Sequence, residues 1–241
     1  MDQDLIERAL VVTAHPDDVD FGAAGTVAAW TAAGCEVTYC ILTDGDAGGF
    51  DPAVPRERIP EIRRAEQRAA GAEVGVVAMH FLGYPDGALY VTHDLRRDIS
   101  RVIRQVRPQR IITSSPVRSY ERLFASHPDH LAAGEATLCA VYPDARNPFA
   151  HPELLAEGLD AWTVSEVWLL APGDTPNRYV DITDTFPAKI AALDSHVSQL
   201  QPDAQPGERE RVWRERHVGL AEQAGFGPGR LAEAFYAVRT D

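Results

Sequence analysis

Short apolar runs alternate with helical patterns along the first two-thirds of the chain. Runs rich in β-branched and apolar residues predict buried strands at residues 9–13, 36–43, 76–82 and 110–113. Apolar residues at helical spacing predict helices at residues 25–33, 56–73, 95–106 and 128–141. Strands separated by helices of this length need crossover connections, so the pattern predicts an α/β fold with a Rossmann-like, doubly wound and mostly parallel sheet flanked by helices.

The last third of the chain is less regular. Residues 166–170 and 178–182 predict further strands, and residues 185–200 and 208–225 predict helices. With no repeat or clear linker, we expect one domain over residues 1–241, in which residues 145–241 complete the pocket. Lys189 is the only lysine of the chain, and we expect it to be a charge on the surface of a helix with no catalytic role.

Charge and composition restrict the location and the partners. The chain has 23 Lys and Arg against 36 Asp and Glu, a net charge of −13, which argues against nucleic acid as a partner. Its start lacks the pattern of a signal peptide, and its apolar runs fall short of the ~20 residues that span a membrane. The three cysteines show no C-x-x-C spacing. We therefore expect a cytoplasmic protein that does not enter a membrane.

One imidazole and two carboxylates follow the first predicted strand, in the sequence Ala14-His-Pro-Asp-Asp18. Ligands of open α/β sheets bind beyond the carboxyl ends of the strands. A nucleotide-binding protein, such as a methyltransferase, would carry a glycine-rich G-x-G-x-x-G loop here, and the glycines at Gly22 and Gly25 do not match that spacing. Histidine and aspartate side chains instead suit a divalent metal ion.

A second cluster, His127-Pro-Asp-His130, lies between the strand at residues 110–113 and the next helix. The two clusters therefore fall on the same edge of the predicted sheet. A single His-Pro-Asp sequence is common in turns, where the aspartate caps a helix, but two of them at the ends of separate parallel strands favour a metal site. Three protein ligands and one open position are typical of catalytic zinc.

The two clusters together resemble the PIG-L/LmbE-like zinc deacetylases, which remove the acetyl group of N-acetylglucosamine-type sugars. The resemblance extends from about residue 10 to residue 199 and includes Arg-Arg-Ala-Glu at 63–66, Phe-Leu-Gly-Tyr-Pro-Asp-Gly at 81–87 and the segment 189–199. Many members have glutamate after Ala-His-Pro-Asp-Asp, whereas this chain has Val19. That position is not a ligand in the family.

The resemblance implies a role for each residue of the two clusters. His15, Asp18 and His130 would bind Zn²⁺, and Fe²⁺ suits the same ligands. Asp17 would be the general base that takes a proton from water. His127 would stabilise the oxyanion or donate a proton, with Asp129 keeping it oriented and protonated.

Three further residues are candidates for substrate binding. Arg63 is implied by the resemblance, although an ion pair with Glu66 on a helix surface explains it equally well. Asp86 lies in a Pro-Asp-Gly turn at the end of a strand, where it could contact a sugar hydroxyl. Arg118 precedes the second cluster and could bind a substrate anion. His196 lies in one of the family-like segments and could face the site.

The sequence thus predicts a metal-dependent hydrolase that releases acetate from an acetylated amino sugar or its conjugate. Two alternatives stay open: an amidase that acts on a larger thiol-sugar conjugate, and a metal-binding Rossmann-like module without catalysis. The retained Asp17 and His127 argue against the second alternative, since binding alone needs no acid and base. The oligomeric state is open as well, and a homo-oligomer is compatible with the sequence.

Overall fold

The strands of the chain form one mixed sheet. A computed structural model describes residues 6–120, 123, 126–170, 176–200 and 207–240. In this part of the chain seven strands lie in the order β3-β2-β1-β4-β5-β7-β6. Their bounds are β1 Arg8–Thr13, β2 Glu36–Thr43, β3 Ala78–Tyr84, β4 Arg110–Ser114, β5 Glu166–Leu170, β6 Arg178–Asp181 and β7 Ala232–Arg239. Strands β1 to β5 are parallel, whereas β7 runs antiparallel to both β5 and β6.

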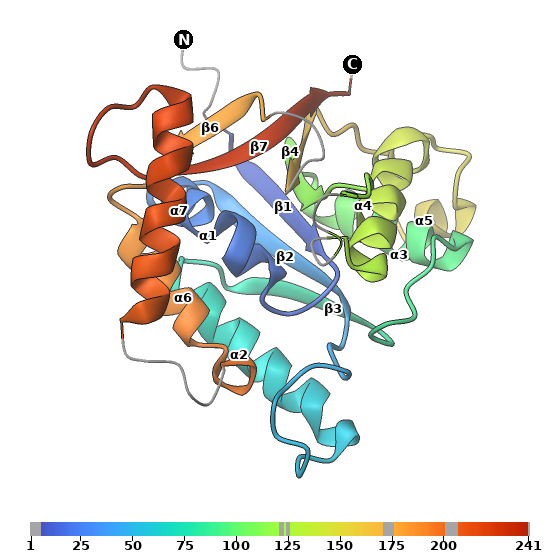
Figure 1. The fold of residues 1–241 in the computed structure, drawn as a ribbon. Helices are drawn as coiled ribbons and strands as arrows, with labels where there is room; N and C mark the ends of the chain where they lie inside the picture. The colour runs from blue at the N-terminus through green and yellow to red at the C-terminus, as the bar shows by residue number, and fades with distance from the viewer. Residues whose placement is uncertain (1–5, 121–122, 124–125, 171–175, 201–206, 241) are drawn as a thin grey trace.

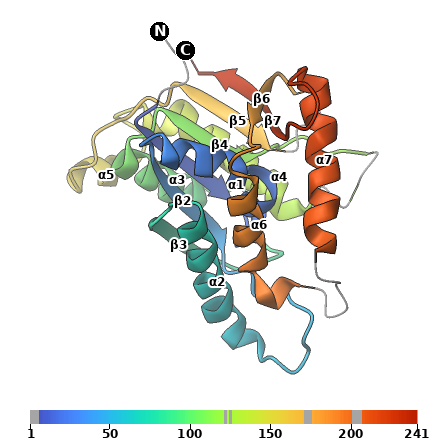
Figure 2. The same ribbon diagram turned by 90° about the vertical axis from the view of Figure 1, so that its left-hand side faces the viewer.

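Helices cover both faces of this sheet, as Figures 1 and 2 show. Their bounds are α1 Asp18–Ala32, α2 Ile59–Glu73, α3 His93–Val106, α4 Pro128–Cys139, α5 Pro152–Ala156, α6 Phe186–Asp194 and α7 Glu208–Ala224. Along β1, Ala9 and Val11 pack into the core on the side of α1, while Leu10 and Val12 pack against α3 and α4. A strand buried on both faces is typical of a doubly wound sheet, so the fold class predicted from the sequence is confirmed.

The order of the strands indicates where a ligand would bind. The chain leaves β1 toward β2 on one side of the sheet and later returns to place β4 on the other side of β1. This reversal between β1 and β4 is the topological switch point, where ligands of doubly wound sheets bind. His15 follows β1, and the cluster at 127–130 precedes and opens α4, the helix after β4.

Several elements differ from their prediction, and helix α5 was not predicted at all. Helix α1 begins at Asp18 rather than at residue 25. The predicted helix at 185–200 is α6 followed by a short 3-10 helix, Val197–Gln199. Strand β7 was not predicted, because three alanines and a glutamate among its eight residues weaken its strand pattern. Its place in the sheet depends on pairing with β5 and β6.

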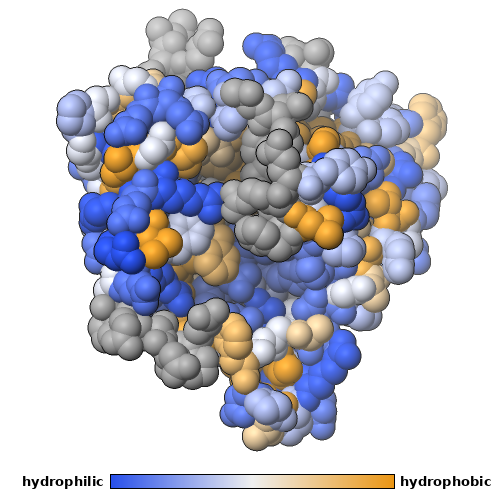
Figure 3. All heavy atoms as spheres, viewed as in Figure 1, coloured by the Kyte–Doolittle hydropathy of each residue, from blue (hydrophilic) through white to orange (hydrophobic). Residues whose placement is uncertain are grey.

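The surface is mainly hydrophilic on the face that Figure 3 draws. Hydrophobic residues form small separate groups on this face. None of the helices in the described residues has both the length and the apolar character that crossing a membrane requires. Lys189, which we expected on this surface, is instead completely buried in α6, so that prediction was wrong.

Candidate active site

The turn after β1 places two carboxylates beside a histidine. Thr43, the last residue of β2, holds this turn by donating its main-chain N–H and its hydroxyl to the carbonyl of Ala14, at 2.8 and 2.9 Å. Asp17 then adopts a left-handed conformation, with φ of 91°, and α1 begins at the next residue. A left-handed aspartate reverses the chain sharply, so that His15 and Asp18 come together: the His15 N–H donates to Asp18 Oδ2 at 2.8 Å.

His15, Asp18 and His130 converge on one point. His15 Nδ1 lies 3.1 Å from His130 Nε2 and 3.5 Å from Asp18 Oδ2, and His130 Nε2 lies 3.0 Å from Asp18 Oδ1. Zinc bonds of about 2.0–2.1 Å in a tetrahedral site separate neighbouring ligand atoms by about 3.3 Å. Two imidazoles and one carboxylate at these separations fit a divalent transition metal.

The electrostatics of this cluster also favour a cation. Burial disfavours a charged His15, but hydrogen bonds to Asp129, Asp18 and Asp86 raise the pKa of its imidazole to about 12. Three carboxylates thus favour positive charge on the His15 ring and around it, and a metal ion at Nδ1 would supply such charge. The ring nitrogens of His15, His127 and His130 form a second group close enough to hold a metal, with one nitrogen of each within 4.8 Å of the others.

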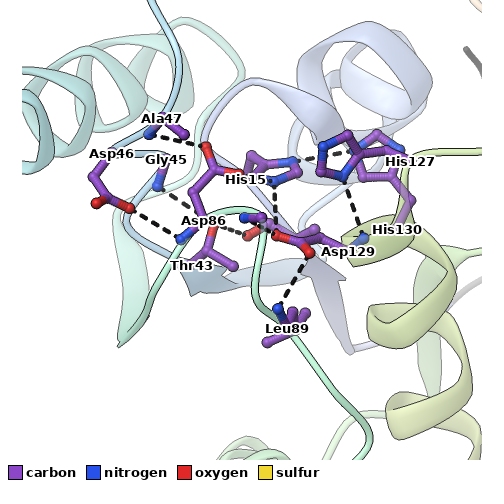
Figure 4. A network of polar contacts seen from close by, with 12 residues as sticks. His15, Thr43, Gly45, Asp46, Ala47, Asp86, Leu89, His127, Asp129 and His130 are labelled. Atoms are coloured by element: carbon purple, nitrogen blue, oxygen red, sulfur yellow. Dashed lines mark hydrogen bonds and ion pairs between the residues drawn. The ribbon is translucent and has the colours of Figure 1, made fainter.

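Two carboxylates hold the far side of the His15 ring, as Figure 4 shows. His15 Nε2 lies 3.0 Å from Asp86 Oδ1 and 3.3 Å from Asp129 Oδ2. Asp129 is fixed in turn by the main-chain N–H groups of Gly87 and Leu89, at 2.7 and 3.2 Å. Carboxylates in this position orient a metal-binding imidazole and make it a stronger ligand for the metal.

These contacts correct one prediction and restrict another. The carboxylate of Asp129 does not orient His127, as we expected from the sequence, but faces His15. Asp86, predicted to bind a sugar hydroxyl, uses one oxygen for His15 and accepts the Ala47 N–H with the other, at 3.3 Å. A sugar hydroxyl would have to share these carboxylate oxygens.

His127 offers a proton on one defined nitrogen. Its Nδ1 accepts the main-chain N–H of Asp129 at 3.2 Å, so a neutral ring carries its proton on Nε2. Burial, together with neighbouring His15 and His130, lowers the pKa of His127 below its ordinary value. This direction favours a neutral imidazole, which would donate through Nε2, over the imidazolium expected from the sequence.

Arg63 is bound to Asp17 rather than exposed for a substrate. Its side chain is almost fully buried in α2, where Nη2 donates to Asp17 Oδ2 at 2.9 Å and to the carbonyl of Pro16, while Nη1 donates to the carbonyl of Gly45. The alternative ion pair with Glu66 is also absent from its contacts, since Glu66 accepts from Ser198 instead. Burial raises the pKa of Asp17 to about 7 against the opposing effect of Arg63.

Arg118 and His196 lie outside this cluster. The exposed Arg118 donates to the carbonyl of Ser126 at 3.3 Å, which places its guanidinium beside the second cluster. His196 is buried behind α1, where its Nε2 lies 2.8 Å from Asp20 Oδ2. The sequence did not predict that Arg63 is buried, nor that Gln67 accepts a hydrogen bond from Asp17. Its only indication was that both residues lie on one face of a predicted helix.

The protein has a doubly wound sheet and a cluster of His and Asp side chains at its switch point. It is therefore an α/β protein with a candidate metal centre. The sequence model of the family described as PIG-L, GlcNAc-PI de-N-acetylase, matches residues 10–141. The chain belongs to this family. Both motif clusters, and hence all the predicted ligands, lie within the matched part.

Named relatives agree with this assignment. The chain is 34% identical to a diacetylchitobiose deacetylase of Thermococcus kodakarensis over 82% of this chain and 72% of that protein. It is also 34% identical to a probable N-acetyl-alpha-D-glucosaminyl L-malate deacetylase 2 of Bacillus cereus, over 80% of this chain and 84% of that protein. Among solved structures, the N,N'-diacetylchitobiose deacetylase of Pyrococcus horikoshii has a TM-score of 0.87 and 29% identity, covering 97% of this chain and 84% of that one.

Proposed function

We propose that this chain hydrolyses the N-acetyl group of an N-acetylglucosamine-type amino sugar or its conjugate and releases acetate. The observation that carries the proposal is the convergence of His15, Asp18 and His130 with Asp17 directly beside them. Relatives that cover most of the chain are named for the removal of acetyl groups from N-acetylglucosamine derivatives.

We assign the metal position to His15 Nδ1, the Asp18 carboxylate and His130 Nε2. Zn²⁺ is our first choice, because two imidazoles and a carboxylate with an open position are typical of catalytic zinc, and Fe²⁺ suits the same ligands. When bound, such an ion supplies Lewis acidity, which polarises a carbonyl and acidifies water. Asp86 and Asp129 keep the His15 ring in place for it.

Asp17 is the general base of the proposed reaction. Arg63 holds Oδ2 of its carboxylate, and we assign proton acceptance from the attacking water to the other oxygen, Oδ1. His127 donates its Nε2–H to the carbonyl oxygen as negative charge develops there. The proton on Asp17 then passes to the leaving nitrogen, so that the C–N bond breaks to give acetate and a free amine.

The remaining parts of the proposal concern the surroundings of the site. The pairing of β7 with β5 supports one domain over residues 1–241. That residues 145–241 complete the pocket stays a prediction from the sequence. The substrate is a small acetylated amino sugar or conjugate rather than a nucleic acid. Location in the cytoplasm and assembly into a homo-oligomer stay predictions from the sequence, as do substrate contacts of Asp86 and Arg118.

A substrate panel tests the proposed function. The zinc-loaded chain should release acetate from at least one of N-acetylglucosamine, N,N'-diacetylchitobiose and N-acetylglucosaminyl malate, with an equal amount of free amine, measured by an enzymatic acetate assay and amine labelling. N-acetyl-lysine, an acetamide without a sugar ring, is the matched control and should release none. If no acetylated amino sugar yields acetate, the proposal fails.

A further inference from the structure

Asp17 needs support from its surroundings to keep its backbone conformation. Its φ of 91° is rare for a residue other than glycine, and such strain persists only where neighbouring groups fix the chain. Its main-chain N–H donates to Gln67 Oε1 at 2.7 Å, from the facing surface of α2. Gln67 is completely buried, so this bond forms without competition from solvent.

The amide group of Gln67 can have only one orientation. Its Nε2 donates to Asp20 Oδ2 at 2.9 Å, and a buried carboxylate can only accept. With Nε2 turned to Asp20, Oε1 must face the N–H of Asp17. Asp20 therefore decides that Gln67 presents an acceptor to Asp17 rather than a donor.

His196 extends this chain of contacts to the C-terminal third of the protein. Its Nε2 lies 2.8 Å from the same oxygen of Asp20, which requires the proton on Nε2, and both side chains are buried. His196 follows α6, a helix that packs against both α1 and α2. A residue distant in sequence thus holds the carboxylate on which the orientation of Gln67 depends.

We propose that His196, Asp20 and Gln67 form a positioning network that fixes the main chain of Asp17 and thereby aims its carboxylate at the reacting water. His196 is a positioning residue, because it acts through Asp20 and Gln67 and does not touch the proposed metal ligands. The inference rests on the proposed function of Asp17 as the base. Misplacement of a catalytic group by about 1 Å can cost about 10²-fold in rate.

Replacement of His196 tests the network. His196→Leu should lower kcat for acetate release by about 10- to 100-fold, with KM changed by less than about twofold and with the zinc content of the wild type. His196→Gln, whose Nε2 can reach the same oxygen of Asp20, should stay within about threefold of the wild type. His217→Leu is the matched control: His217 is as buried as His196 but contacts the carbonyl of Ala232, and its loss should leave kcat unchanged.

A second variant and a second measurement keep the test independent of folding and of activity. If His196→Leu does not fold, Gln67→Leu should give the same loss of kcat. Hydrogen exchange at the Asp17 amide, measured without substrate, should be faster in either variant than in the wild type. A wild type that releases no acetate overturns the proposed function, whereas unchanged exchange at Asp17 overturns the network.

Two further results would contradict the network. One is a His196→Leu variant that melts at a lower temperature while its kcat equals that of the wild type, since this would show a purely structural histidine. The other is an equal loss of kcat in His196→Gln and His196→Leu, because only the leucine variant lacks a donor for Asp20.

Discussion

Asp17→Asn is expected to lower kcat for acetate release by about 10²- to 10⁴-fold, the usual contribution of a general base. Asparagine keeps the size of the side chain, and its amide oxygen can still accept from Arg63, so the change removes the proton acceptor rather than the packing. KM should stay near the wild-type value, because Asp17 acts on the attacking water and not on the sugar.

The zinc content separates this explanation from a simple loss of metal. Asp17→Asn should retain about one equivalent of zinc per chain, measured by plasma mass spectrometry, since Asp17 is not among the three proposed ligands. Asp18→Asn is the matched control: the neighbouring aspartate is a proposed ligand, and its replacement should lower both zinc content and activity. An Asp17→Asn variant with nearly full activity would place the base elsewhere.

The second large effect concerns stability. Lys189→Met should lower the free energy of unfolding by about 3–5 kcal/mol, as expected when one partner of a buried ion pair is removed. Lys189 Nζ donates to Glu233 Oε1 at 2.7 Å and to the carbonyls of Asp20 and Phe21 in α1, and both charged side chains are almost completely buried. Methionine fills a similar volume but leaves Glu233 without a cation.

The other half of the pair explains why the loss is large. Glu233, in β7, accepts the main-chain N–H groups of Gly25 and Thr26 at 3.1 and 2.7 Å. The pair therefore joins α1, α6 and β7 through hydrogen bonds at the middle of α1. Chemical denaturation of the single variants and of Lys189→Met/Glu233→Gln forms a double-mutant cycle, in which the double variant should be more stable than Lys189→Met alone.

The pH dependence of this variant has a defined sign. Burial favours a neutral Glu233, but Lys189 and the hydrogen bonds to Glu233 hold the pKa of this carboxyl below its ordinary value. The pair therefore stabilises the wild type above the unfolded pKa of about 4.3, and this stability is lost as the pH falls through the folded pKa. Without Lys189, the pKa of Glu233 rises, because burial is then opposed only by the remaining hydrogen bonds and by His217, and the rise costs stability above pH of about 4.3. The difference between variant and wild type should therefore grow from pH 4 to pH 7.

An exposed ion pair provides the control for the stability measurements. Arg211 and Glu215 lie 2.8 Å apart on the surface of α7, and Arg211→Ala should change the free energy of unfolding by less than about 1 kcal/mol. A Lys189→Met variant as stable as the wild type at pH 7 would show that the buried pair contributes nothing to the fold.

The fold and the two clusters could be predicted because they depend on local patterns. Alternation of strands and helices fixes the parallel sheet, and the sheet brings His15 and His130 to one edge although 115 positions separate them. The start of α1 at Asp18 was not predicted, because Gly22 and Gly25 disfavour a helix when local sequence alone is considered. In the fold these glycines allow close packing, since a Cβ at Gly22 or Gly25 would lie within 2.9 Å of the side chain of Leu170 or Ile182, respectively.

The contacts of the site could not be predicted because they join distant segments. Asp129 is next to His130 in sequence, yet its carboxylate turns to His15 and to the loop after β3. Arg63 and Lys189 carry charges that sequence patterns place on helix surfaces, and only packing against α1 shows that each is buried beside an acidic partner. Long-range ion pairs of this kind leave no periodic signal in the sequence.

Zinc titration of the metal-free chain tests the central proposal most directly. After chelation and removal of the chelator, acetate release should be undetectable, then rise in proportion to added Zn²⁺ and level off at about one equivalent per chain. His130→Ala should bind zinc more weakly and remain inactive at that equivalent. Full acetate release from protein shown by elemental analysis to be free of metal would contradict the account.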